Sequence, residues 1–144
     1  MYYLEDNMLI EKIIFYTITE EEIKNHICEQ MMKLIEKHLE KDWDWCELSC
    51  NPNVTIEYVE KHPENPWDWD ELSVNPSATM EYVEKHPEKP WNWFELSQNP
   101  NMTMEYVEKH PDKSWNWGRL SENLFNREAK VFREKLNERI NFNL

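Results

Sequence analysis

Tryptophan recurs through this chain in pairs, and successive pairs lie 24 residues apart. Each pair encloses a single residue, and all eight tryptophans belong to the pairs Trp43/Trp45, Trp67/Trp69, Trp91/Trp93 and Trp115/Trp117. A fixed period of this size is typical of repeat proteins, in which similar units stack on one another. The spacing therefore constrains the fold more than any other feature of the sequence.

Each repeat begins with a short amphipathic segment. The segment at residues 55–62 is matched at 79–86 and 103–110. Its first residue is a threonine, whose hydroxyl can satisfy a backbone N–H at the start of a helix. Proline follows the last histidine of each copy, and the residue before a proline disfavours the helical conformation. The sequence predicts a helix of about two turns here, with Thr55, Thr79 and Thr103 as caps.

The second segment of each repeat carries the tryptophan pair. We expect its helix to begin near Pro66 or Pro90, because the first turn of a helix tolerates proline. Asp42 and Ser114 stand at the same place in the other copies and can act as caps. The helix should end at Asn75 in a left-handed conformation, before Pro76.

Short helices of this kind are unstable alone and gain stability only by packing. The sequence therefore predicts an all-α protein, a short α-solenoid of 24-residue helix-turn-helix repeats with N- and C-terminal capping helices. We expect one repeat domain over 1–144, made of an N-terminal cap at 1–40, tryptophan-rich repeats at 41–123 and a C-terminal cap helix at 124–144.

The two ends of the chain carry their own signals. Thr19-Glu20-Glu21-Glu22 is a capping box and predicts the start of a long helix that ends near residue 40. The apolar side of the last helix should be Leu124, Phe125, Ala129, Phe132, Leu136 and Ile140. Within residues 1–18 the apolar spacing from Leu9 to Ile14 favours a short helix, and the β-branched content leaves a strand open.

Helical geometry separates the two tryptophans of a pair. Trp69 lies within about 60° of Leu72 on a helical wheel, whereas Trp67 points about 160° away from Trp69. The second tryptophan should therefore fill the core. The predicted core is Trp45, Trp69, Trp93, Trp117, Leu48, Leu72, Leu96, Leu120, Ile56, Val59, Val83 and Val107.

The first tryptophan of each pair has two open interpretations. It either fills a seam between repeats or lines the outside as a ladder of aromatic rings. The candidate interaction surface therefore consists of Trp43, Trp67, Trp91 and Trp115, together with Tyr58, Tyr82 and Tyr106. A buried indole needs a partner for its N–H, and turn carbonyls or Asn and Asp side chains are expected to serve.

The chain is acidic, with a net charge of −13, and this disfavours binding to nucleic acid. Residues 118–144 differ, since six Lys/Arg and four Glu give them a charge of about +2. A partner with a basic surface, or self-association, is expected. An odd count of three cysteines, with neither a signal peptide nor a membrane-spanning segment in evidence, favours an intracellular protein.

No catalytic, metal or cofactor site is predicted. His38, His62, His86 and His110 recur at one repeat position, but stacked repeats should hold them about 10 Å apart, too far to share a metal ion. We expect each imidazole to form a hydrogen bond at the turn, and protonation of the four could make stability sensitive to pH. Asp68, Asp70 and Glu71 are not kept as a group in other copies, and Cys46 and Cys50 lack further ligands.

The pattern resembles the tryptophan-rich repeats of uncharacterised proteins from giant DNA viruses of amoebae, the mimivirus-like group. The residues that carry the resemblance are Trp67-Asp68-Trp69, Leu72-Ser73, Asn75-Pro76, Thr79, Glu81-Tyr82-Val83 and His86-Pro87, with their copies at 91–111. It covers about residues 34–123. The resemblance implies a viral, non-enzymatic repeat protein in host cytoplasm or virion, and it supplies no active site.

The sequence thus favours a protein-protein interaction module or a structural component. The alternative is a protein that binds a peptide, a carbohydrate or another ligand on an exposed tryptophan ladder. An enzyme would require a concave pocket with converging polar groups, and none is expected.

Overall fold

The computed structural model describes residues 18–142, with the side chains of 126–128 and 138–142 excepted. The short helix expected between Leu9 and Ile14 lies outside this range, as does the side chain of Ile140. The chain divides into two compact units, Met1–Lys41 and Asp42–Leu144. The division falls one residue beyond the predicted limit of the N-terminal cap at residue 40.

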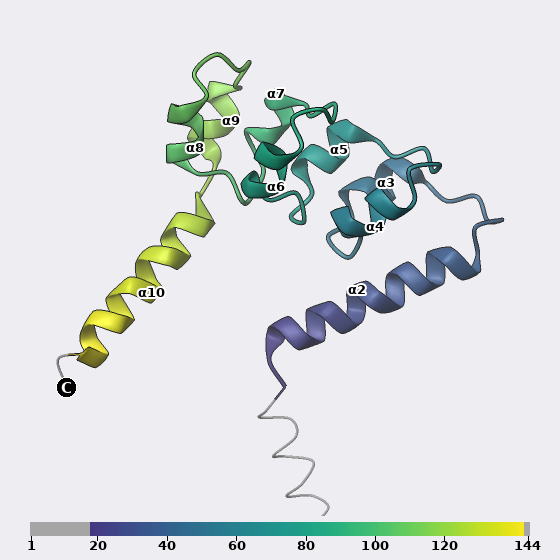
Figure 1. The fold of residues 1–144 in the computed structure, drawn as a ribbon, viewed down its shortest axis with the longest axis horizontal. Helices are drawn as coiled ribbons and strands as arrows, with labels where there is room; N and C mark the ends of the chain where they lie inside the picture. Colours follow the sequence, from purple (N-terminus) through teal and green to yellow (C-terminus); the bar gives the residue numbers. More distant parts are fainter. Residues whose placement is uncertain (1–17, 143–144) are drawn as a thin grey trace, which may run out of the picture. The chain divides into compact units, whose positions relative to one another are not determined.

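The protein is all-α, and its repeats form a short helical solenoid, as the sequence predicts (Figure 1). In the described residues all regular elements are helices. Their bounds are α2 Glu20–Lys37, α3 Trp45–Cys50, α4 Ile56–Lys61, α5 Trp69–Val74, α6 Met80–Lys85, α7 Trp93–Leu96, α8 Met104–Lys109, α9 Trp117–Glu122 and α10 Asn126–Phe142. The second helices of successive repeats stack directly, α3 against α5 and α5 against α7.

The long helix α2 of the first unit begins with the predicted capping box. The backbone N–H of Glu22 donates to Oγ1 of Thr19 over 3.1 Å, and the N–H of Thr19 donates to Oε2 of Glu22 over 2.8 Å. Three glutamates in the first turn also suit the positive end of the helix dipole. These interactions confirm the predicted start of the helix, which ends at Lys37.

The first helix of each repeat has the predicted threonine cap. The N–H groups of Tyr58, Tyr82 and Tyr106 donate to the threonine three residues earlier, over 3.1–3.3 Å. The histidine that precedes each proline ends the helix. Each of these helices contains six residues, somewhat fewer than expected.

The second helix begins later than predicted, at the second tryptophan of each pair. Its N-cap is the residue enclosed by the pair: Asp44, Asp68, Asn92 or Asn116. Asp68, for example, accepts the N–H groups of Asp70 and Glu71 at 2.9 and 3.3 Å. The expectation of a start near Pro66 or Pro90, with caps at Asp42 and Ser114, is therefore wrong. A carboxylate or amide oxygen beside the N2 and N3 positions is the better cap.

The end of the second helix also differs from the prediction. Asn75 has φ −61° and ψ 132°, which is extended backbone and not the left-handed conformation. Pro76 follows it, and the residue before a proline is restricted to extended conformations. Asn51 and Asn123 adopt the same geometry, so the asparagine serves another purpose.

That purpose is to join one repeat to the next. Nδ2 of Asn75 lies 2.8 Å from the Ser49 carbonyl oxygen, 3.0 Å from that of Asn51 and 3.3 Å from that of Val54. Asn99 repeats the arrangement one period on, with the carbonyls of Ser73, Asn75 and Ala78. Asn123 reaches the carbonyls of Ser97 and Asn99. The Asn75 and Asn99 side chains are fully buried, so these bonds satisfy polar groups that water cannot reach.

A serine provides a second connection between repeats. Oγ of Ser49 donates to the Trp45 carbonyl over 2.7 Å and accepts the N–H of Asp68 over 2.9 Å. Ser73 and Ser97 bond in the same way to the N–H groups of Asn92 and Asn116. Each serine therefore fixes the start of the next second helix relative to its own.

The last helix, α10, presents its apolar side to solvent. Phe132 and Leu136 are exposed, as is Leu124 just before the helix. The backbone of Phe125 has φ 45°, a left-handed value that is costly for a bulky residue, at the point where the chain turns into α10. Figure 1 shows α10 continuing beyond the last repeat.

The asparagine column predicts a position-dependent effect of mutation. Asn99→Ala removes an amide donor from three buried carbonyls and should lower the free energy of unfolding by about 2–3 kcal/mol. Asn51→Ala is the matched control, because Asn51 accepts the N–H of Asn53 but stands in the first repeat, with no earlier repeat in this unit to bridge. Urea unfolding followed by circular dichroism should show the larger loss for Asn99; equal losses would contradict the bridging role.

Candidate interaction surface

The first tryptophan of each pair lies before the second helix and not on it. Nε1 of Trp67 donates to the backbone carbonyl of His62 over 2.8 Å. Trp91 and Trp115 form the same bond with His86 and His110, over 2.9 and 2.8 Å. The carbonyl is left without a helical partner because the first helix ends there. The expected turn partner for the indole is thus a backbone carbonyl.

The second tryptophan of one repeat packs against the first tryptophan of the next, with the two ring planes nearly perpendicular. The ring centroids of Trp69 and Trp91 lie 5.1 Å apart at 83°. The Trp45–Trp67 and Trp93–Trp115 pairs lie 5.0 and 5.5 Å apart at 87° and 90°. This T-shaped geometry is favourable for aromatic rings. The two tryptophans therefore meet across the junction between repeats.

The burial of the two tryptophan series corrects the prediction made from helical geometry. Trp91 and Trp115 are buried, with 6% and 7% of their surfaces exposed, and Trp43 and Trp67 are half-buried. The second series, assigned to the core, is half-buried at Trp45, Trp69 and Trp93, and Trp117 is 70% exposed. The wheel placed both rings on one helix, whereas the helix begins only at the second ring. An exposed ladder of first-series rings is not formed.

The tyrosines proposed as surface anchors belong to the interior of the repeats. Tyr58 and Tyr106 are buried and Tyr82 is half-buried. Each ring lies 6.0–6.4 Å from the first tryptophan of its own repeat. Burial raises the pKa of Tyr106 to about 12, and burial together with the neighbouring Glu60 carboxylate raises the pKa of Tyr82. These rings support the junctions between repeats rather than an external surface.

The aliphatic residues assigned to the core are buried. They are Leu48, Leu72, Leu96, Leu120, Ile56, Val59, Val83 and Val107. Ala78, Met80 and Met102 join them. Apolar burial of this extent is the principal stabilising contribution in helices as short as these.

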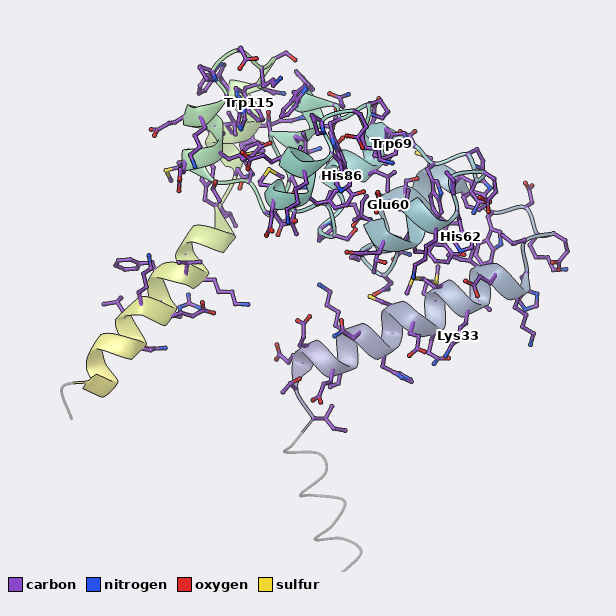
Figure 2. All side chains as sticks on the ribbon, viewed as in Figure 1. Lys33, Glu60, His62, Trp69, His86 and Trp115 are labelled. Atoms are coloured by element: carbon purple, nitrogen blue, oxygen red, sulfur yellow. The ribbon has the colours of Figure 1, made fainter. Side chains whose placement is uncertain are left out.

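Lysines cover two of the half-buried tryptophans. Nζ of Lys89 lies 5.7 Å from the ring centroid of Trp69, and Nζ of Lys113 lies 4.7 Å from that of Trp93. A cation above an indole face is attracted by the ring's quadrupole. Nζ of Lys89 also lies 3.8 Å from Oε1 of Glu60. Glu60 and Trp69 are labelled in Figure 2. The rings of Trp69 and Trp93 are therefore already contacted by lysines of the same chain.

The histidines behave largely as predicted. Nδ1 of His62 and of His86 each lies 3.3 Å from a glutamate two residues later, at the turn after the first helix. Their rings pack on tyrosine, at 4.3 Å for Tyr58–His62 and 4.2 Å for Tyr82–His86. His110 packs on Tyr106 at 4.5 Å, but its Nε2 is buried without a hydrogen-bond partner among the described residues, so the predicted bond is not formed by that nitrogen. Sensitivity of the stack to protonation of these groups stays a prediction.

A column of like charges runs along the stacked second helices. Glu47, Glu71 and Glu95 occupy one repeat position, and Arg119 takes it in the last copy. Partial burial, with the charges of Asp68, Glu95 and Glu47, raises the pKa of Glu71 above its ordinary value of 4.5. Arg119 forms an ion pair with Glu95 and lies 4.8 Å above the Phe94 ring. Neighbouring carboxylates of this column therefore repel one another, and the column ends in the positive charge of Arg119.

The described residues contain no group of three or more His, Cys, Asp or Glu that could hold a metal ion. Partial burial and Glu47 raise the pKa of the Cys50 thiol, which keeps it protonated and poorly nucleophilic. A hollow of about 420 Å³ is lined by residues of α6, α8 and α10, among them Met80, Tyr106, Val131, Phe132 and charged side chains. Within residues 18–142, none of the helices combines the length and the hydropathy that a membrane crossing requires.

Comparison of the chain with protein-family models, curated proteins and solved structures gives no match. The geometry of the repeats therefore carries the functional argument.

The apolar surface that the structure exposes in the repeat unit lies mainly at its C-terminal end. Trp117 and Leu124 are 70% and 78% exposed, and Val131, Phe132 and Leu136 of α10 are also exposed. The helical wheel assigned Trp117 to the core because it treated every repeat as internal. The available signal was the sequence after it, since position 139, one period beyond Trp115, is Arg139 and not tryptophan.

The two tryptophan environments predict different mutational costs. Trp91→Phe removes the indole bond to His86 and leaves a gap beside Trp69, and should cost about 1–3 kcal/mol of unfolding free energy. Trp117→Phe should change it by no more than about 0.5 kcal/mol, because no later repeat packs on that ring. Chemical unfolding of both variants tests this, and acrylamide quenching should fall most when Trp117 is replaced.

The carboxylate column predicts that one glutamate destabilises the fold at neutral pH. The folded-state pKa of Glu71 is raised above 4.5, so its ionisation opposes folding above that pKa. This cost decreases as pH falls through the folded-state pKa and is absent below about 4.5. Glu71→Gln should therefore raise stability at pH 7 by roughly 0.5 kcal/mol, with the gain disappearing near pH 4. Thermal melts at several pH values test this against Glu108→Gln, an exposed control; a gain independent of pH would contradict it.

Proposed function

We propose that this protein is a non-enzymatic interaction module that binds a protein partner through the C-terminal end of its repeat stack. The observation that carries the proposal is the exposure of Trp117. Its equivalents Trp69 and Trp93 pack on the first tryptophan of the next repeat at 5.1 and 5.5 Å, whereas Trp117 is 70% exposed. A large aromatic ring that is left exposed at the end of a repeat stack is characteristic of an anchor in a binding surface.

The surroundings of Trp117 support the same surface. Leu124 is exposed nearby in sequence, and a hollow of about 300 Å³ is lined by Arg119, Glu122, Asn123 and Leu124. Residues 118–144 carry a charge of about +2 against about −15 for the rest of the chain. An apolar anchor with basic surroundings suits an acidic protein surface.

Binding of a ligand on a ladder of first-series tryptophans is a weaker candidate. Trp91 and Trp115 are buried, and their Nε1 groups already donate to backbone carbonyls. The second series has lysines over Trp69 and Trp93. The resemblance to giant-virus repeats would place an interaction module of this kind in the virion or the host cytoplasm, as part of an assembly.

Affinity capture with a matched pair of variants tests the binding surface. Tagged wild-type protein, Trp117→Glu and Met104→Glu are each incubated with extract of infected amoebae, the setting that the resemblance implies. Met104 is the control because it is an exposed apolar residue on α8, the first helix of the same repeat, and not on α9 with Trp117. Trp117→Glu should lose at least about tenfold of the captured partner and Met104→Glu should retain it. Equal capture by all three would contradict the proposed surface.

A further inference from the structure

We infer that the partner of the C-terminal end is the N-terminal end of the repeat stack in a second copy of this chain, so that copies join head to tail. This inference rests on the proposed function and names its partner. The inference follows from the junctions inside the molecule, where the C-terminal side of one repeat already packs against the N-terminal side of the next.

An internal junction has three components. The second tryptophan of one repeat packs in T-shaped geometry against the first tryptophan of the next, as Trp69 packs against Trp91. A serine Oγ accepts the N–H of the next N-cap residue, and two or three carbonyls accept the amide of the next asparagine. In hydrogen-bond terms, the earlier repeat supplies acceptors and the later repeat supplies donors.

The C-terminal end of the stack carries the acceptor half of a junction. Trp117 offers its exposed ring, and Ser121, which corresponds to Ser97, is exposed instead of buried. The Ser121 hydroxyl donates to the Gly118 carbonyl over 2.6 Å and keeps its capacity to accept. The carbonyls of Ser121 and Asn123 occupy the positions that correspond to those of Ser97 and Asn99, which accept the Asn123 amide. Residues 124–144 contain no further copy of the repeat that would supply the next asparagine.

The N-terminal end of the repeat unit carries the donor half. Asn51 corresponds to Asn75 and Asn99, and its Oδ1 accepts the N–H of Asn53 as in the other copies. Its Nδ2 has no hydrogen-bond partner within the part of the chain that the structure describes, and the side chain is half-exposed. Asp44 is the exposed N-cap residue whose N–H corresponds to those of Asp68 and Asn92. Trp43 is the first-series ring of this repeat and keeps part of its surface exposed.

Charge also favours this pairing. The internal column places Glu47, Glu71 and Glu95 in succession, and the pKa of Glu71 is raised partly by its two neighbours in the column. At a head-to-tail junction the Glu47 of one copy would follow the Arg119 of the other. Arg119 already pairs with Glu95 across an internal junction, which shows that this column accommodates an ion pair. The join between copies is therefore electrostatically better than the Glu71–Glu95 step within one.

Such an interface is heterologous, because the two joined surfaces differ. Any open assembly keeps one unused surface of each kind at its two ends, so association continues into a longer chain of copies or closes into a ring. This property separates the inferred arrangement from a symmetric dimer, in which both copies use the same patch.

Sedimentation velocity and native mass spectrometry of the purified full chain test the inference. At about 100 μM, wild-type protein should form a series of species at whole-number multiples of the monomer mass. Trp117→Glu disables the acceptor end, and Asn51→Asp replaces the amide donor with a carboxylate that repels carbonyl oxygens. Glutamate is acceptable at the first position of α9, and the introduced carboxylate can still accept the Asn53 N–H, so both variants should keep the wild-type circular dichroism spectrum. Each variant alone should weaken association at least about tenfold.

Mixing the two variants provides the decisive measurement. Trp117→Glu retains a working donor end and Asn51→Asp retains a working acceptor end, so an equimolar mixture should form a dimer of one of each and nothing larger. A mixture that stays monomeric while wild-type protein associates would overturn the head-to-tail arrangement. Association that persists unchanged in both single variants would overturn it as well.

A wild-type protein that remains monomeric would overturn self-association. The proposed function would still stand if Trp117→Glu lost a different captured protein that Met104→Glu retained. The two proposals therefore fail under different observations.

Discussion

The repeat stack depends on one buried side-chain amide per junction. Asn75 and Asn99 each direct Nδ2 at three backbone carbonyls of the preceding repeat, with both side chains fully buried. Those carbonyls belong to the ends of six-residue and shorter helices and to the turns that follow, where the helix cannot satisfy them. Because buried carbonyls are costly without a donor, the distance between repeats is fixed wherever an asparagine stands. The tryptophans fill the space that this spacing creates.

Much of the fold could be predicted from the sequence because it depends on short-range signals such as helix caps and prolines. The 24-residue period is visible in the spacing of the tryptophans. The threonine caps and the helix end at each histidine depend only on residues that are close together in the sequence. The asparagine, by contrast, was assigned to a left-handed turn, because a helix-ending Asn before Pro76 has that local interpretation. Its partners lie 21–26 residues earlier, and such distant hydrogen bonds have no signature in a local pattern.

The candidate site illustrates the same limit. A helix start displaced by about three residues, from near Pro66 to Trp69, was enough to change the expected roles of the two rings. The enclosed Asp or Asn was the missing signal: it is a good cap, and it places one tryptophan before the helix and one at its first position. With that register the first ring reaches the carbonyl that ends the preceding helix, and the second ring reaches forward to the next repeat.

Each repeat consequently has a direction. It presents acceptors and its second tryptophan toward its successor, and donors and its first tryptophan toward its predecessor. Stacking equivalent units in this way satisfies every internal junction and leaves one half-junction at each end, whatever the number of repeats. A terminal helix that buried Trp117 would remove the C-terminal half, but α10 leaves that ring 70% exposed and keeps its own apolar residues in solvent. Arg119 replaces the glutamate in the last repeat, so the column of charges changes sign only at this end. A Glu47 from a second copy that joined there would face a positive charge instead of another carboxylate.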